Sequence, residues 1–158
     1  MAHARDIRNL RCEESFRSAA GKVIWTRFEE MLSYQEVALA GEDIEGIHDM
    51  RVASRRLRAA LELFRDAFPK RRLAPLLREV KALADSLGEV RDTDVMIERL
   101  ERDMKGRPRS ERLVLSDIVA ELKETRESAR EQLKANISRL EDEDFPRRFL
   151  AVIAQEAM

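Results

Sequence analysis

Apolar residues recur at every third or fourth position along most of the chain, which is the spacing of amphipathic α-helices. The clearest stretch predicts a helix from about Ile47 to Phe68, ended by Pro69, because the residue before a proline leaves the α region. Its apolar face consists of Met50, Ala53, Leu57, Ala60, Leu61, Phe64 and Phe68. The strict alternation typical of β-strands is not seen in the sequence, so we predict an all-α helical bundle.

The same periodicity predicts the remaining helices, giving five or six in a single domain of residues 1–158. They cover about 5–40, 70–87, 93–104, 110–140 and a short segment around 149–153. Glycine, proline and acidic residues mark the expected breaks, which are 41–46, 106–108 and 141–146. Gly88 fits the end of one helix, and Asp92 or Thr93 fits the N-cap of the next.

The composition excludes several classes of protein. Cys12 is the single cysteine, so no internal disulfide is expected, and His3 and His48 lack further ligands at metal-binding spacing. We therefore expect no metal and no resident cofactor. No apolar stretch approaches the roughly 18 residues of a membrane span, and the first residues do not form the apolar core of a secretory signal. We expect a cytoplasmic protein.

Charge is unevenly distributed along the chain. The net charge is −1, but residues 51–72 contain eight basic residues and only Glu62 and Asp66 as acids. This window carries +6, which leaves −7 on the rest of the chain. The basic window therefore predicts a local anion-binding surface on an otherwise acidic molecule.

A helical wheel places His48, Arg51, Arg55 and Arg58 within about 80° of one another, opposite the apolar face. We call these four residues the basic ridge. A solvated helix face usually interleaves acids three or four positions from its arginines, yet Arg51 and Arg55 have none there. Arginine also suits bidentate binding of phosphate. The span from Arg51 to Arg58, about 10 Å, fits a linear polyanion, and His48 can serve as a phosphate donor.

Two segments resemble a known family. Residues 48–58 read HDMRVASRRLR and resemble the signature of the CHAD domain, the conserved histidine α-helical domain. Residues 87–95 read LGEVRDTDV and are similar to that family's LGxxRDxDV segment. The two segments occur in the expected order and at a plausible distance.

The resemblance implies a helical bundle that binds inorganic polyphosphate through basic residues lining a channel. By motif match, the binding residues would be His48, Arg51, Arg55, Arg56, Arg58 and Arg91. Arg56 falls near 80° on the wheel, away from the basic ridge, so its assignment rests on the motif alone. Asp92 and Asp94 would orient arginines and cap the following helix. Arg27, Arg78 and Lys81 are further candidates on neighbouring helices.

The sequence departs from the family in length. CHAD domains usually contain two related helical halves, whereas this chain contains only one helix with the histidine and arginine pattern. We interpret it as a short or half-length member, in which a homodimer would complete the channel. The apolar segment 149–153 fits a missing partner, and it equally fits packing on its own bundle.

The leading hypothesis is a non-enzymatic polyphosphate-binding module, located in the cytoplasm or on polyphosphate granules. One alternative is a scaffold whose basic ridge docks an acidic partner, and another is an accessory domain for phosphate chemistry. Catalysis would require a phosphate loop or a metal-holding acid cluster, and Asp92 with Asp94 is too small a set. Nucleic acid is disfavoured as a ligand because the basic ridge contains no aromatic residue on which bases could stack.

Overall fold

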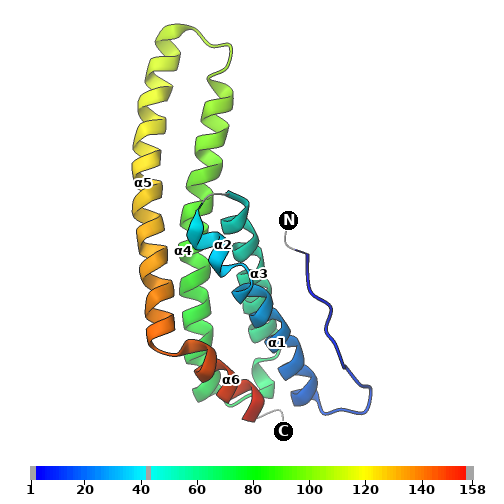
Figure 1. Ribbon diagram of the computed structural model, residues 1–158. Helices are drawn as coiled ribbons and strands as arrows, with labels where there is room; N and C mark the ends of the chain where they lie inside the picture. The colour runs from blue at the N-terminus through cyan, green and yellow to red at the C-terminus, as the bar shows by residue number, and fades with distance from the viewer. Residues whose placement is uncertain (1–2, 42–43, 156–158) are drawn as a thin grey trace.

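The fold is a bundle of α-helices, seen in a computed structural model that describes residues 3–41 and 44–155 (Figure 1). The elements are α1 (Phe16–Leu32), α2 (Gln35–Ala40), α3 (Ile44–Leu63), the 3₁₀ turn η1 (Arg65–Ala67), α4 (Lys70–Asp103), α5 (Arg109–Asp142) and α6 (Phe145–Gln155). No strand occurs in these described ranges, so the predicted all-α class is confirmed.

The core forms where α1 packs on α3, α3 on α4, and α4 on α5. The apolar face predicted for α3 is buried in this core, with Met50, Leu57 and Leu61 fully enclosed. Phe28 of α1 and Val80 of α4 are fully buried as well. Burying a side chain of this size contributes roughly 1.5–3 kcal/mol. The apolar pattern of α3 therefore fixes which of its faces is left for the basic ridge.

The predicted first helix, 5–40, is wrong in its start and in its continuity. Residues 3–15 run as an irregular segment beside α1 (Figure 1). The helix begins after Ser15, whose side chain accepts a hydrogen bond from the Ser18 amide at 3.1 Å and caps it. It ends at Leu32, and α2 follows after a two-residue turn. The hydroxyl of Ser33 donates to the Glu30 carbonyl at 2.7 Å and so helps to end α1.

The break predicted at Gly88 is also wrong, because α4 runs unbroken from Lys70 to Asp103. Asp92 and Thr93 are not caps but interior residues, and Thr93 donates its hydroxyl to the Glu89 carbonyl at 2.7 Å. A glycine inside a helix costs roughly 0.5–1 kcal/mol. One buried face, formed by Leu83, Leu87, Val90 and Ile97 on both sides of Gly88, outweighs that cost.

Other element ends differ by a few residues from the predictions. α3 ends at Leu63 and η1 leads to Phe68, which is extended before Pro69 as expected. The helix α5 continues to Asp142, so the first part of the predicted acidic loop is helical. The predicted connector 41–46 is short, since α3 already begins at Ile44. Glu42 and Asp43 of that connector lie outside the described residues.

The two longest helices, α4 and α5, form an antiparallel hairpin whose joined ends project beyond the other helices (Figure 1). Each has 34 residues, which corresponds to about 51 Å. The projecting part carries exposed apolar side chains, namely Val95, Met96, Leu113, Val114 and Ile118. We call these five residues the hairpin patch.

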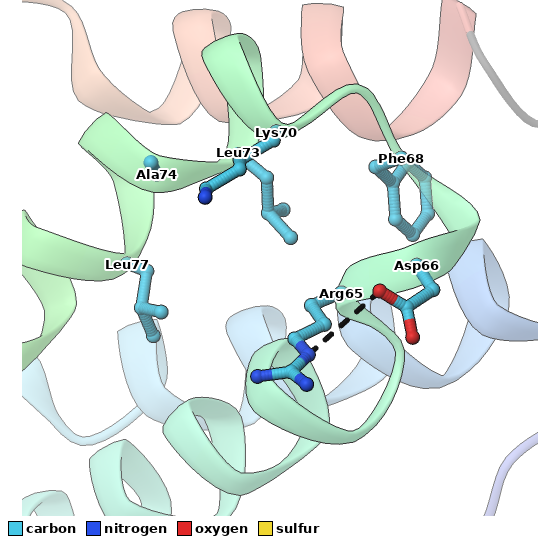
Figure 2. Close-up of a pocket in the computed structure, with 7 residues that line it drawn as sticks. All are labelled: Arg65, Asp66, Phe68, Lys70, Leu73, Ala74 and Leu77. Carbon is cyan, nitrogen blue, oxygen red and sulfur yellow. Dashed lines mark ion pairs between the residues drawn. The ribbon is translucent and has the colours of Figure 1, made fainter.

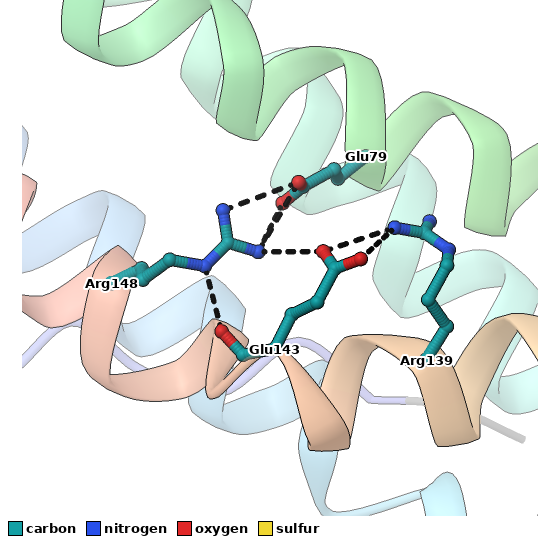
Figure 3. Close-up of polar contacts among 4 residues, drawn as sticks. All are labelled: Glu79, Arg139, Glu143 and Arg148. Carbon is teal, nitrogen blue, oxygen red and sulfur yellow. Dashed lines mark hydrogen bonds and ion pairs between the residues drawn. The ribbon is translucent and has the colours of Figure 1, made fainter.

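The last helix, α6, closes the bundle on the side of α1. The Phe149 ring stacks on Phe28, with centroids 4.0 Å apart and planes inclined by 10°. Arg148 donates to the Glu79 carboxylate of α4 at 3.1–3.2 Å and to the Glu143 carbonyl at 2.9 Å (Figure 3). Arg139 of α5 binds the Glu143 carboxylate from its other side (Figure 3). The apolar face of 149–153 is therefore covered by its own chain.

Candidate anion-binding site

The basic ridge lies along α3, on the side of the helix that borders α4. Its residues are His48, Arg51, Arg55 and Arg58, and all except the exposed Arg55 are half-buried. The opposite face of α3 packs on the core, as the wheel predicts. The core thus holds the ridge in place, while its side chains remain partly or fully exposed.

Arg51 crosses α4 at Gly88. The Nε atom of Arg51 lies 3.8 Å from the point that a Cβ on Gly88 would occupy, which is an ordinary van der Waals distance. Its Nη2 atom is 3.9 Å from Oδ1 of Asp92, whose side chain is 75% exposed. At this distance and exposure, the ion pair contributes at most about 1 kcal/mol.

Arg58, at the other end of the ridge, has two acidic neighbours. Its Nε atom donates to Oε1 of Glu62 on the next turn of α3 at 2.9 Å. This hydrogen bond is the main cause that raises the pKa of Arg58, and Asp85 of α4 adds a smaller effect of the same sign. Carboxylates therefore flank the ridge from α4, which a wheel of α3 alone cannot reveal.

The other two residues of the ridge, His48 and Arg55, have no such acidic partner among the described residues. Within the part of the chain that the structure describes, neither His48 nor Arg55 forms a hydrogen bond or an ion pair. Arg51 and Arg58 on both sides of Arg55 have only partly exposed acidic partners. The ridge consequently keeps cationic groups that an external anion can reach.

Arg56 and Arg27 lie elsewhere, around the carboxylate of Glu30. Glu30 is completely buried between α1 and α3, and it accepts hydrogen bonds from Arg56 at 2.6 Å, from Arg27 at 2.5 Å and from the Arg5 amide at 3.2 Å. Burial raises the pKa of Glu30, but the hydrogen bonds from Arg56 and Arg27 outweigh burial and leave it below its ordinary value. The structure thus places these two arginines in an internal ion network, apart from the ridge.

Arg91 lies three residues after Gly88 on α4 and belongs to a second group of charges around Asp94. Its Nη1 atom is buried and has no hydrogen-bond partner among the described residues. Asp94, one turn further along α4, is only 3% exposed. Burial raises the pKa of Asp94, and Arg126, Arg130 and Arg91 offset this effect only in part.

Two arginines of α5, Arg126 and Arg130, were missed by the sequence analysis. Arg126 Nη1 is 3.7 Å from Oδ1 of Asp94. Arg130 reaches over to Gly41, where a side chain would displace its guanidinium group, and the φ of +69° at Gly41 favours glycine. The four-residue spacing of Arg126 and Arg130 was a visible signal, but only the packing of α5 on α4 shows what they face.

The remaining candidates, Arg78 and Lys81, are exposed on α4. They fall on the same stripe of α4 as Asp85 and Gly88, the residues that border Arg58 and Arg51. No ion pair or hydrogen bond holds either side chain among the described residues. They can therefore turn toward a ligand on the ridge, although they do not form part of it.

A pocket of about 610 Å³ lies away from the ridge, at the junction of η1 and α4 (Figure 2). Leu73, Leu77 and Phe68 form its apolar wall. Arg65 at its edge is 3.7 Å from Asp66, and both side chains are largely exposed.

No group of acids, histidines or cysteines suited to a metal ion occurs within residues 3–41 and 44–155. In the same ranges, no helix combines the length and the apolar character that crossing a membrane requires.

Comparison with known proteins agrees with the two sequence signatures. The family model of the CHAD domain matches residues 22–158. Among curated relatives are two from Mycobacterium tuberculosis: Uncharacterized protein Rv2226 (strain ATCC 25618 / H37Rv), 32% identical over 75 residues, and Uncharacterized protein MT2285 (strain CDC 1551 / Oshkosh), 31% identical over 75 residues. Each match covers 48% of this chain and only 15% of the relative. No solved structure shows a significant match. Since the family model spans most of the sequence, the chain belongs to the CHAD domain family.

Proposed function

We propose that this chain is a non-enzymatic module that binds inorganic polyphosphate along the basic ridge of α3. The observation that carries the proposal is that His48 and Arg55 of the ridge have no partner among the described residues. CHAD domains are known in polyphosphate-related proteins, which favours polyphosphate over other linear polyanions. The location that follows is the cytoplasm or the surface of polyphosphate granules.

The acids beside the ridge do not prevent this function. The carboxylates of Asp92 and Glu62 are at least half exposed, so their ion pairs with Arg51 and Arg58 are screened by water. A phosphate chain offers each guanidinium group a bidentate contact, which is stronger than the 3.9 Å ion pair of Arg51 and would replace the 2.9 Å hydrogen bond of Arg58 to Glu62. We therefore expect Arg51 and Arg58 to exchange these acids for ligand oxygens at little cost.

We further propose that the protein acts as a homodimer. One chain presents a single ridge on one helix, and a second copy would supply the opposite wall of a channel. The hairpin patch is an exposed apolar surface suited to such contact. The patch also supports the second candidate function, a scaffold that binds another protein, and capture of a partner that polyphosphate cannot displace would favour that function.

The direct test is titration with long-chain polyphosphate, comparing the wild type with Arg51→Glu/Arg55→Glu. The matched control is Lys134→Glu/Arg147→Glu, which changes the net charge equally at exposed sites outside the ridge. We expect the ridge variant to lose at least tenfold in affinity and the control to change much less. Binding should also weaken steeply with added salt, because the ligand releases counterions.

Equal affinity of all three proteins would refute the proposed function. Release of orthophosphate from polyphosphate in the presence of Mg²⁺ would instead show an enzyme. If RNA or DNA displaced polyphosphate at equal phosphate concentration, the ligand would be a nucleic acid. These measurements use the same samples and separate the alternatives directly.

A further inference from the structure

We propose that Arg91, Arg126 and Arg130 form a second subsite for a phosphoryl group, next to the N-terminal end of α3. We call these three residues the arginine cluster. The inference deepens the proposed function, because the cluster would bind the part of a polyphosphate chain that extends beyond the ridge. It assigns binding roles to Arg126 and Arg130 of α5, which neither sequence signature contains.

Three guanidinium groups in this cluster share one buried carboxylate. Asp94 is 3% exposed, and Arg126 approaches it at 3.7 Å, while Arg130 and Arg91 are close enough to act on it electrostatically. Two further described acids act on this group, and both are exposed: Glu127 is 62% exposed beside Arg126, and Glu98 is exposed on α4. Asp94 therefore offers a single negative charge to three guanidinium groups, whose hydrogen-bond donors outnumber its acceptor positions.

One of these donors is unsatisfied in the structure. The Nη1 atom of Arg91 is buried from solvent and has no acceptor among the described residues. Leaving a buried donor without a partner costs about 1–3 kcal/mol, and more when the group is charged. A phosphoryl group carries several oxygens and a negative charge, so it supplies what the cluster lacks, whereas an apolar or cationic ligand would not.

The cluster also lies in line with the ridge. Arg51 crosses α4 at Gly88, Arg91 comes three residues later, and Asp94 three residues after that. The helical rise between Gly88 and Asp94 is about 9 Å. On the far side, Arg130 lies against Gly41, just before α3 begins at Ile44. A chain that leaves the ridge near His48 and Arg51 would therefore meet Arg91 and then the arginines of α5.

Replacing Asp94 should change the affinity for polyphosphate in the opposite direction from replacing the arginines. Its carboxylate occupies part of the space and the charge that a phosphoryl group would use. Replacing it by the similarly shaped asparagine removes this competition while it preserves packing. If the cluster binds phosphate, Asp94→Asn should tighten polyphosphate binding, whereas a purely structural ion network would give no gain.

The experiment measures polyphosphate affinity and its salt dependence for four proteins. They are the wild type, Arg126→Gln/Arg130→Gln, Asp94→Asn, and the control Lys134→Gln/Arg147→Gln, each checked for folding by circular dichroism and thermal unfolding. We expect the cluster variant to bind at least fivefold more weakly with a shallower salt slope, Asp94→Asn to bind at least twofold more tightly, and the control to stay near the wild type.

The outcomes distinguish this inference from the proposed function. If Arg51→Glu/Arg55→Glu abolishes binding but a folded Arg126→Gln/Arg130→Gln binds like the wild type, the ridge stands and the cluster is overturned. If the cluster variant loses its fold, Asp94→Asn decides, because unchanged or weaker binding by that folded variant rejects the subsite.

If wild type does not bind polyphosphate, the proposed function fails first. Titration with pyrophosphate then tests the cluster alone, and equal binding by wild type and cluster variant rejects it.

Discussion

Glu30 shows how one buried carboxylate decides what a neighbouring arginine does. Four arginines occur within the eight residues from Arg51 to Arg58, and like charges so close repel one another. Glu30 accepts hydrogen bonds from Arg56 and Arg27 and so directs Arg56 toward α1, away from the ridge. The same carboxylate joins α1, α3 and the N-terminal segment through the Arg5 amide.

We expect Glu30→Gln to lower the free energy of unfolding by roughly 2–3 kcal/mol at pH 7. Breaking a buried ion pair leaves unpaired charge, and the partial exposure of Arg27 and Arg56 reduces the usual loss. Because the folded-state pKa of Glu30 lies below its ordinary value, its stabilisation is present above about pH 4.5 and is lost as the pH falls further.

Urea unfolding of both proteins at pH 7 and at pH 3 measures this difference. The exposed neighbour provides the control, since Glu29→Gln should change stability by no more than about 0.5 kcal/mol. A Glu30→Gln protein as stable as the wild type at pH 7 would contradict the role given to Glu30.

Residue by residue, the sequence predicted which side chains face away from the core only within a single helix. The wheel of α3 correctly separated Arg51, Arg55 and Arg58 from the core. It could not show that Asp92 and Asp85 approach from α4, because those contacts depend on how two helices pack. For the same reason, Arg126 and Arg130 looked like ordinary charges of a mixed helix until α5 was placed beside Asp94.

At the scale of elements, α4 is the clearest difference between pattern and structure. Gly88 and the capping types Asp92 and Thr93 are local signals for a break, and by themselves they favour two helices. The buried residues on both sides, from Leu83 to Ile97, share one face that only a continuous helix can present to α3 and α5. Packing along the whole helix thus decides against a local preference.

We expect Gly88→Ala to raise the free energy of unfolding by about 0.5–1 kcal/mol, because alanine favours a helix interior. The new Cβ would lie 3.8 Å from Arg51, an ordinary van der Waals contact. Gly106→Ala is the contrasting variant and should destabilise, since Gly106 has a φ of +83°. Urea denaturation of both variants tests this, and a loss of stability in Gly88→Ala would indicate that α4 is broken there.

For the whole molecule, the structure separates a closed end from an open one. At the closed end, α6 covers the core with Phe149 and Phe145 and is held by Arg148 (Figure 3). The segment that sequence analysis left between two interpretations thus packs on its own bundle. At the open end, the α4–α5 hairpin projects with the hairpin patch on its surface (Figure 1).

We expect sedimentation equilibrium to give the mass of a homodimer for the wild type and that of a monomer for Leu113→Glu/Val114→Glu. Two projecting hairpins can pack as a four-helix layer, which would bury side chains that are 59% and 61% exposed in one chain. Thermal unfolding shows whether the variant is folded. A wild type that stays monomeric at high protein concentration would exclude this dimer.

The unbroken α4 has a consequence for the choice of ligand. If Gly88 were a joint, the ridge and the arginine cluster could move independently and accommodate ligands of many lengths. A continuous helix instead fixes the distance between the ridge and the arginine cluster, so the protein would respond to the length of the ligand. Polyphosphate too short to bridge both subsites would bind with the affinity of one subsite alone. Longer chains would bind more tightly, because a chain held at one subsite has a high effective concentration at the other. Affinity would then rise in a step at a threshold number of phosphates, as expected for a chelating receptor.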